Sequence, residues 1–156
     1  MENLLKVIVI TLNNQRYGIN VQQILSIEKM QEITRVPRTS EFIKGVINLR
    51  GETIPVIDLK ERLQLETSEP TNQSRILVIQ VDAVTVGLIV DSATDVLDID
   101  TNEIERASEM AGIVNEKYIA GIAKRAEELL LLLNLQTILN FEETEEVIQL
   151  EKVEEE

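Results

Sequence analysis

The chain has 156 residues, of which 44% are hydrophobic and only 3% aromatic, so its length suits one domain or two small ones with an aliphatic core. It contains no His and no Cys, which excludes imidazole bases, thiol nucleophiles, a phospho-accepting His, disulfides and Cys/His zinc sites. The net charge of −13 argues against binding to nucleic acid, and no apolar run approaches the roughly 20 residues that a membrane-spanning helix needs.

Short runs of Val, Ile and Leu in the first half of the chain predict β-strands rather than long helices. Asn13-Asn14 is typical of a tight turn, and so is 50–52, whose Gly51 can take positive φ. Asp58 is a candidate N-cap for a short helix over residues 59–65. The strands expected in this half cover residues 7–12, 17–21, 24–30, 46–49 and 53–57.

The second half continues in the same manner. The polar stretch 66–74, which contains a Pro and has no apolar period, is expected to be the loop between the halves. Asn134 is a candidate cap for a helix over 135–140, and the glutamate-rich segment 142–156 is expected to be a solvated, flexible tail. The strands expected here cover residues 75–81, 84–90, 119–123 and 129–133.

The two halves resemble each other. The run from Tyr17 to Val21 is echoed by Val86 to Val90, and the run from Phe42 to Leu59 aligns without gaps to Tyr118 to Leu135. We therefore expect a duplicated chain with similar halves near residues 10–70 and 73–140. Halves of this size are marginally stable alone, and short strands leave exposed edges unless the sheet closes. The expected fold is all-β, with two small barrels packed on each other and short helices.

The segment 42–59 also resembles the signature of a known family. It reads FIKGVINLRGETIPVIDL, which is similar to the CheW domain pattern of an aromatic-Ile-x-Gly start, Asn-Leu-Arg-Gly, and a closing Asp-Leu. The runs YGINVQQILSIE, VGLIVDSATDVL and YIAGIAKRAEELLLLLNLQTIL resemble the family in the same order. The resemblance implies one CheW-like domain over residues 1–141, built from two five-stranded SH3-like barrels.

The resemblance also implies a role without catalysis or cofactor. Proteins of this family are chemotaxis adaptors that bind the regulatory domain of the histidine kinase CheA and the cytoplasmic tip of methyl-accepting chemotaxis receptors. We therefore expect a cytoplasmic scaffold at receptor arrays on the inner membrane face, without membrane insertion. The N-terminal segment, which lacks the pattern of a secretory signal, favours the same location.

The resemblance assigns expected roles to individual residues. Arg50 at a hairpin tip offers a forked donor for receptor carboxylates, and apolar residues on nearby strands suit a docked helix. The predicted receptor-binding residues are Arg50, Asn48, Ile24, Ile27, Val46 and Ile47. The kinase contact is expected at Val86, Leu88 and Val90. The positions expected to be structural are Gly45, Gly51, Pro55 and Gly121, since Gly permits close approach and Pro favours an edge or bulge.

One position departs from the family pattern. Ser26 stands where relatives often carry a Glu, and a partner salt bridge made by that Glu would be missing here. Glu28 would replace it only if the strand is regular, because residues two apart then share a face.

Two other readings remain open. A CheV-type module or a kinase regulatory domain would need an attached receiver or catalytic domain, and a chain that begins with Met and ends in an acidic tail favours a stand-alone adaptor. A small enzyme using only Asp and Glu would need two facing carboxylates in a pocket. The acidic cluster from Asp91 to Asp100 lacks the Gly and terminal Glu of a calcium loop, so caps and loop acids are the better interpretation.

Overall fold

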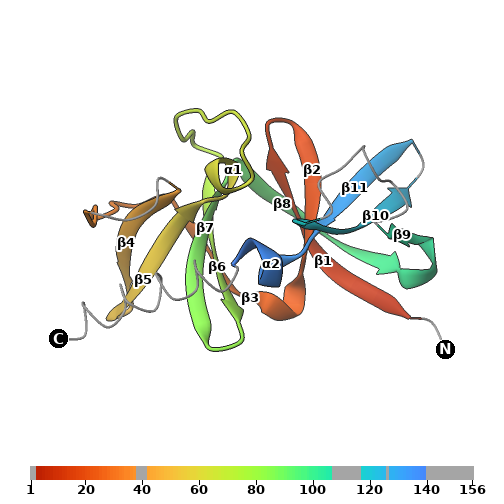
Figure 1. Cartoon of the computed structure of the whole chain (residues 1–156), viewed down its shortest axis with the longest axis horizontal. Helices are drawn as coiled ribbons and strands as arrows, with labels where there is room; N and C mark the ends of the chain where they lie inside the picture. The colour runs from red at the N-terminus through yellow and green to blue at the C-terminus, as the bar shows by residue number, and fades with distance from the viewer. Residues whose placement is uncertain (1–2, 38–41, 107–116, 126, 140–156) are drawn as a thin grey trace.

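The computed structural model describes residues 3–37, 42–106, 117–125 and 127–139, which form two sheets lying side by side (Figure 1). The six-stranded subdomain has the order β8 (Ser92–Asp100), β1 (Leu4–Leu12), β2 (Gln15–Asn20), β11 (Glu128–Leu133), β10 (Ile119–Arg125) and β9 (Ile104–Arg106). The five-stranded subdomain has the order β3 (Ile24–Lys29), β6 (Arg75–Val81), β7 (Val84–Val90), β5 (Glu52–Asp58) and β4 (Ile43–Leu49).

Only short helical segments interrupt the strands. The 3-10 turns η1 (Val21–Gln23) and η2 (Thr101–Glu103) follow β2 and β8, and one-turn α-helices α1 (Leu59–Arg62) and α2 (Leu135–Ile138) follow β5 and β11. Asp58 and Asn134 cap α1 and α2 with their side chains, as the sequence predicts. The predicted all-β fold with two small subdomains and short helices is confirmed, although one sheet has six strands and both helices end earlier than expected.

The two sheets exchange their hairpins. The hairpin β1–β2 pairs with β8 and β11 from the second half of the chain, whereas β6–β7 pairs with β3 and β5 from the first half. The parallel contacts preserve the sequence repeat, because Leu132 lies opposite Gly18 in one subdomain and Val56 opposite Gly87 in the other. The strands are therefore not grouped as 10–70 and 73–140. The sequence repeat cannot reveal this exchange of hairpins, because each half of the chain offers equivalent strands with which either hairpin could pair.

The largest hydrophobic cluster lies between the subdomains. It joins side chains such as Ile10 and Leu12 of β1 to Ile57 of β5 and Leu88 of β7. Smaller clusters fill the interior of each subdomain, around Val9 in one and around Ile76 in the other. The buried apolar residues of the described chain thus gather chiefly where the two subdomains meet, and the marginal stability of either subdomain alone stays a prediction.

Candidate partner-binding surface

The turn between β4 and β5 presents Arg50 to solvent. Leu49 pairs with Glu52, so the loop has two residues, and both have positive φ, at 51° for Arg50 and 85° for Gly51. Two positive φ values identify a type I′ turn, whose twist matches that of the flanking strands. The Asn48 side chain accepts a hydrogen bond from the Gly51 N–H over 3.1 Å, so this residue stabilises the turn. The Arg50 side chain itself is 74% exposed.

Arg50 also reaches across to β3. Its Nη2 lies 3.7 Å from Oε2 of Glu28, whose side chain is only 18% exposed. Opposite Ser26 and Glu28 on β6 lie Val78 and Ile76, two residues apart, so the strand is regular from Ser26 onward and these two side chains share a face. Glu28 therefore supplies a carboxylate two residues beyond the position at which relatives often carry one.

β3 is an edge strand with exposed apolar side chains. Among the described strands it pairs only with β6. Ile27 is 44% exposed on the face opposite Glu28, and Leu25, at the irregularity in pairing between Ile24 and Ser26, is 56% exposed. Ile24 is half-buried against the cluster between the subdomains. The ion pair with Glu28 thus brings Arg50 close to β3, whereas Ile27 lies on the other face of that strand. Leu25 escaped the sequence analysis, which did not anticipate the irregularity in pairing between Ile24 and Ser26.

Five predicted contact residues are not exposed. Val46 and Ile47 of β4 are buried, and Val86, Leu88 and Val90 of β7 lie inside the cluster between the subdomains. Burial of this degree leaves no surface for a partner, so these side chains belong to the core. The resemblance suggested these contacts, whereas the alternation of Val86, Leu88 and Val90 along one strand by itself favours the core position that they occupy.

Besides Gly51 in the β4–β5 turn, the three other positions predicted to be structural have separate physical surroundings. Gly45 has a φ of 143°, and a Cβ there would lie 2.0 Å from the carbonyl oxygen of Thr34, with which Val46 forms a β-bridge. A Cβ at Gly121, its equivalent in the repeat, would lie 2.6 Å from a methyl carbon of Ile104. β5 lies between β4 and β7, so Pro55 is not on an edge strand as expected. It faces Val46, whose N–H and C=O both bond to Thr34, so the missing N–H of Pro55 costs no bond to Val46.

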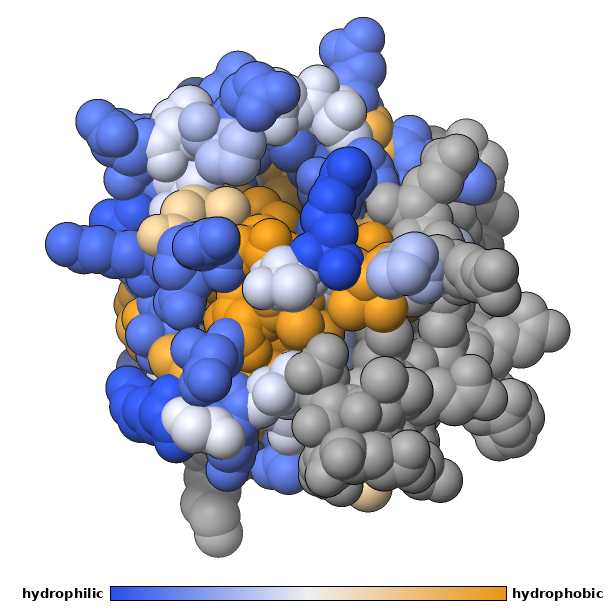
Figure 2. Space-filling model, turned by 90° about the vertical axis from the view of Figure 1, so that its left-hand side faces the viewer, coloured by the Kyte–Doolittle hydropathy of each residue, from blue (hydrophilic) through white to orange (hydrophobic). Residues whose placement is uncertain are grey.

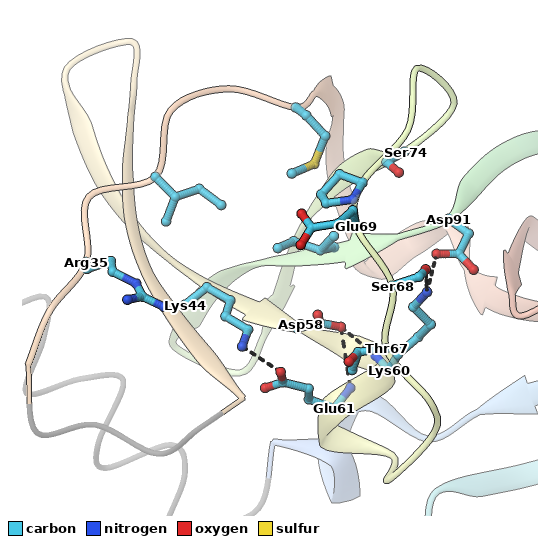
Figure 3. A pocket seen from close by; sticks show the side chains of 14 residues that line it. Arg35, Lys44, Asp58, Lys60, Glu61, Thr67, Ser68, Glu69, Ser74 and Asp91 are labelled. Carbon is cyan, nitrogen blue, oxygen red and sulfur yellow. Dashed lines mark hydrogen bonds and ion pairs between the residues drawn. The ribbon is translucent and has the colours of Figure 1, made fainter.

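An open groove of about 640 Å³ lies beside α1 in the five-stranded subdomain. Figure 2 shows apolar atoms framed by hydrophilic side chains on this end of the molecule, and Figure 3 shows the charged side chains that line the groove. Glu61 pairs with Lys44 at 2.6 Å, and Asp91 pairs with Lys60 at 2.8 Å. Asp58 caps α1, and its burial raises the pKa of its carboxyl. Carboxylates engaged in this way favour a structural role over acid–base catalysis.

The described residues contain no group of three or more acidic side chains arranged to hold a metal ion. The same part of the chain has no helix that is long and apolar enough to cross a membrane.

Comparison with known families identifies the domain. A family model described as the CheW-like domain matches residues 6–143. The chain belongs to the CheW-like family. Its resemblance to "Chemotaxis protein CheW" of Bacillus subtilis extends over 92% of each chain at 41% identity. The crystal structure of the scaffolding protein TtCheW from Thermoanaerobacter tengcongensis superposes with a TM-score of 0.81 at 33% identity, covering 90% of this chain and 96% of that one.

A CheV-type relative is also similar to this CheW-like chain. "Chemotaxis protein CheV3" of Helicobacter pylori is 31% identical over 80% of this chain, but the match covers only 41% of that protein. The resemblance predicted from the segment 42–59 is therefore confirmed at the level of the family, and the chain is a member of a family of chemotaxis scaffold proteins.

Proposed function

We propose that this CheW-like protein is a cytoplasmic adaptor that couples methyl-accepting chemotaxis receptors to the regulatory domain of the histidine kinase CheA. The observations that carry the proposal are the exposed Arg50 at the β4–β5 turn and the exposed Leu25 and Ile27 on the edge strand β3, on a domain of the CheW-like family. The role requires only non-covalent binding. Signalling then changes the active population of the kinase through the geometry in which the adaptor holds both partners.

The receptor-binding surface in this proposal consists of Leu25, Ile27, Asn48 and Arg50. An amphipathic helix docks by placing apolar side chains against an apolar surface, which Leu25 and Ile27 of the edge strand provide. Arg50 supplies a forked donor for a carboxylate on that helix. Its ion pair with Glu28, at 3.7 Å and with an exposed guanidinium, is weak enough for a partner carboxylate to replace it.

The kinase-binding surface must lie away from the buried residues of β7, and we place it at the end of the six-stranded subdomain. Leu129 is exposed there beside the turn between β10 and β11. A hollow of about 250 Å³ is lined by Glu128 and Leu130, which flank Leu129 in the sequence, and by Leu97, Arg16 and Arg125. Replacing Leu129 by Glu is expected to weaken kinase binding by about tenfold while receptor binding is retained, since hydrophobic interface anchors are worth roughly 1–2 kcal/mol or more. Equal binding of the kinase by parent and variant would move the surface elsewhere.

The decisive experiment on the receptor side reverses the charge of Arg50. Arg50→Glu is expected to weaken binding to a receptor signalling fragment by about tenfold or more, because a charge-assisted contact becomes a repulsion. Affinity is measured by calorimetry with receptor and kinase from one species. Lys6→Glu, an exposed charge reversal on β1, is the matched control and should bind as the parent does.

The proposal fails if the parent protein binds neither partner. If Arg50→Glu instead loses cooperative unfolding, Arg50 is a structural residue and the receptor surface is wrongly placed.

A further inference from the structure

Helix α1 carries two basic side chains that are almost completely buried. Lys60 is 4% exposed and Arg62 6% exposed, although α1 is a single turn at the surface of the five-stranded subdomain. Removing a cation from water costs several kcal/mol, so such residues persist only where the surroundings pair them well. Neither residue belongs to the proposed partner surfaces, and both make contacts that cross to the other subdomain.

Arg62 lies between equivalent aromatic residues of the two subdomains. Its guanidinium is 4.7 Å from the ring centre of Tyr118, which precedes β10, and 5.4 Å from that of Phe42, which precedes β4. Nη1 donates to the Tyr118 hydroxyl over 2.5 Å, and Nε donates to the carbonyl oxygen of Ile138 in α2 over 2.8 Å. A single side chain therefore joins α1 and the entry to β4 with α2 and the entry to β10.

Lys60 makes a second connection on another side of α1. Its Nζ contacts Oδ1 of Asp91 and Oγ of Ser68, both at 2.8 Å (Figure 3). It also contacts Oδ1 of Asn13 at 3.3 Å. Asn13 lies in the turn between β1 and β2, and Asp91 joins β7 to β8. Asp91 also accepts from the Asn13 N–H over 2.8 Å and donates its own N–H to Thr11. This network ties α1 to the exchanged hairpin β1–β2.

The hydrophobic cluster between the subdomains and the polar contacts of α1 constrain the two subdomains in different ways. Burial of apolar surface is favourable but non-directional, so it brings the two sheets together without fixing one angle. Hydrogen bonds to charged groups depend on distance and direction, and an unpaired buried cation is penalised in any other arrangement. The contacts of Lys60 and those of Arg62 extend from different sides of α1. Together they restrict rotation between the subdomains better than either set does alone.

We propose that α1 sets the orientation of the two subdomains, with Lys60 and Arg62 as positioning residues. This inference deepens the proposed function, because an adaptor with one partner surface on each subdomain transmits a signal only while the angle between those surfaces is defined. Loosening either contact should leave binding to each single partner intact and weaken the coupling between them.

The first experiment measures the orientation and does not depend on any partner. The chain has no Cys, so spin labels can be placed on Gln80→Cys in β6 and Glu103→Cys in η2, which are exposed and lie in different subdomains. Pulsed electron paramagnetic resonance then gives the distribution of label distances. Lys60→Met and Arg62→Met are expected to broaden or shift a narrow parent distribution. Lys44→Met is the matched control, since it breaks an ion pair to α1 that stays within one subdomain.

Milder variants cover the case in which a methionine variant fails to fold. Ser68→Ala removes one partner of Lys60, and Arg62→Lys keeps the charge but loses the planar fork that stacks and donates in two directions. Broadening in these variants supports the proposal. The proposal is overturned if folded Ser68→Ala and Arg62→Lys both give the distance distribution of the parent, and if every methionine variant that folds does so too.

The second experiment separates this inference from the proposed function. Kinase activation by receptor is measured with each variant, alongside the affinity for receptor alone and for kinase alone. We expect activation to fall about fivefold or more, a change within the usual range of coupling between two binding sites. The affinity for each single partner should stay within about twofold of that of the parent. Failure of the parent protein to activate the kinase would refute the proposed function but leave the distance test standing. Full activation by variants with broadened distances would refute the link between orientation and coupling.

Discussion

Arg50 holds a backbone conformation that most side chains avoid. Left-handed φ costs an ordinary residue roughly 1–2 kcal/mol, whereas Asn tolerates it well. The equivalent problem in the β1–β2 turn is solved by Asn13-Asn14, which have φ values of 52° and 68°. Arg50→Asn is therefore expected to raise the free energy of unfolding by about 0.5–1 kcal/mol in urea titrations. The same variant should bind the receptor fragment more weakly, and Asn14→Arg in the β1–β2 turn should destabilise by a similar amount. Stability of Arg50→Asn equal to or below that of the parent would show that the arginine is not strained.

Gly45 and Gly51 both have positive φ, but their surroundings differ. A Cβ at Gly45 would overlap the carbonyl oxygen of Thr34 at 2.0 Å, while nothing lies within 4 Å of one at Gly51. Gly51→Ala should cost only the conformational penalty of about 1–2 kcal/mol, and Gly45→Ala should cost about 3 kcal/mol or more because backbone must also move. Chemical denaturation of the two variants in parallel checks the difference. Equal losses would mean that the bridge between Thr34 and Val46 shifts freely.

At the scale of elements, the caps of α1 and α2 differ in one charge. Asp58 accepts from the N–H groups of Lys60 and Glu61, whereas Asn134 accepts from that of Thr137. Burial, and secondarily the negative charge of Glu61, raise the pKa of the Asp58 carboxyl above 3.8, against the lowering effect of its backbone hydrogen bonds and Lys44. The folded state then binds this proton more tightly than the unfolded state, so the contribution of Asp58 to stability is present at low pH and is lost as pH rises through the folded pKa.

Replacing Asp58 by Asn tests this linkage. The variant keeps a capping side chain, as Asn134 does in the repeat, but removes the titration. We expect the gain in free energy of unfolding, relative to the parent, to be larger at pH 7 than below the ordinary Asp pKa of about 3.9. Thermal unfolding across that range measures it, and Asn134→Asp is the reciprocal control. A gain that is independent of pH would show that Asp58 ionises as readily in the folded protein as in the unfolded chain.

The elements also show where sequence reasoning succeeds and where it stops. β3, β6 and β7 follow the predicted runs to within one residue, whereas β1 begins three residues earlier than predicted. β8 was not predicted, since the segment SATDVLDID carries three Asp residues and only its Ser92 and Ile99 are buried. Its pairing with β1 holds it in place, which local propensity cannot reveal. The turn at Arg50 was predictable from local chemistry, but the burial of Val86 and Leu88 depends on which sheet their hairpin joins.

At the scale of the whole molecule, the exchanged hairpins make the two halves of the chain depend on each other. Each subdomain takes strands from both halves, and the largest hydrophobic cluster lies between the subdomains. An unexchanged arrangement would let each half close its own sheet. In the exchanged arrangement, the first half of the chain alone contains β3, β4 and β5. It lacks the β6–β7 hairpin that lies between β3 and β5 in the sheet.

Cleavage between the halves distinguishes these arrangements. Pro70 and Thr71 are exposed in the segment that joins α1 to β6, so a protease site inserted there should be cut without unfolding the protein. We expect the two fragments to stay together in size-exclusion chromatography under native conditions. Each fragment, once separated in denaturant and refolded alone, should lack cooperative thermal unfolding, and mixing should restore the circular dichroism spectrum of the intact chain. A first fragment that unfolds cooperatively by itself would show that the hairpins β1–β2 and β6–β7 can pair within their own halves, and that the exchange is not needed to close a sheet.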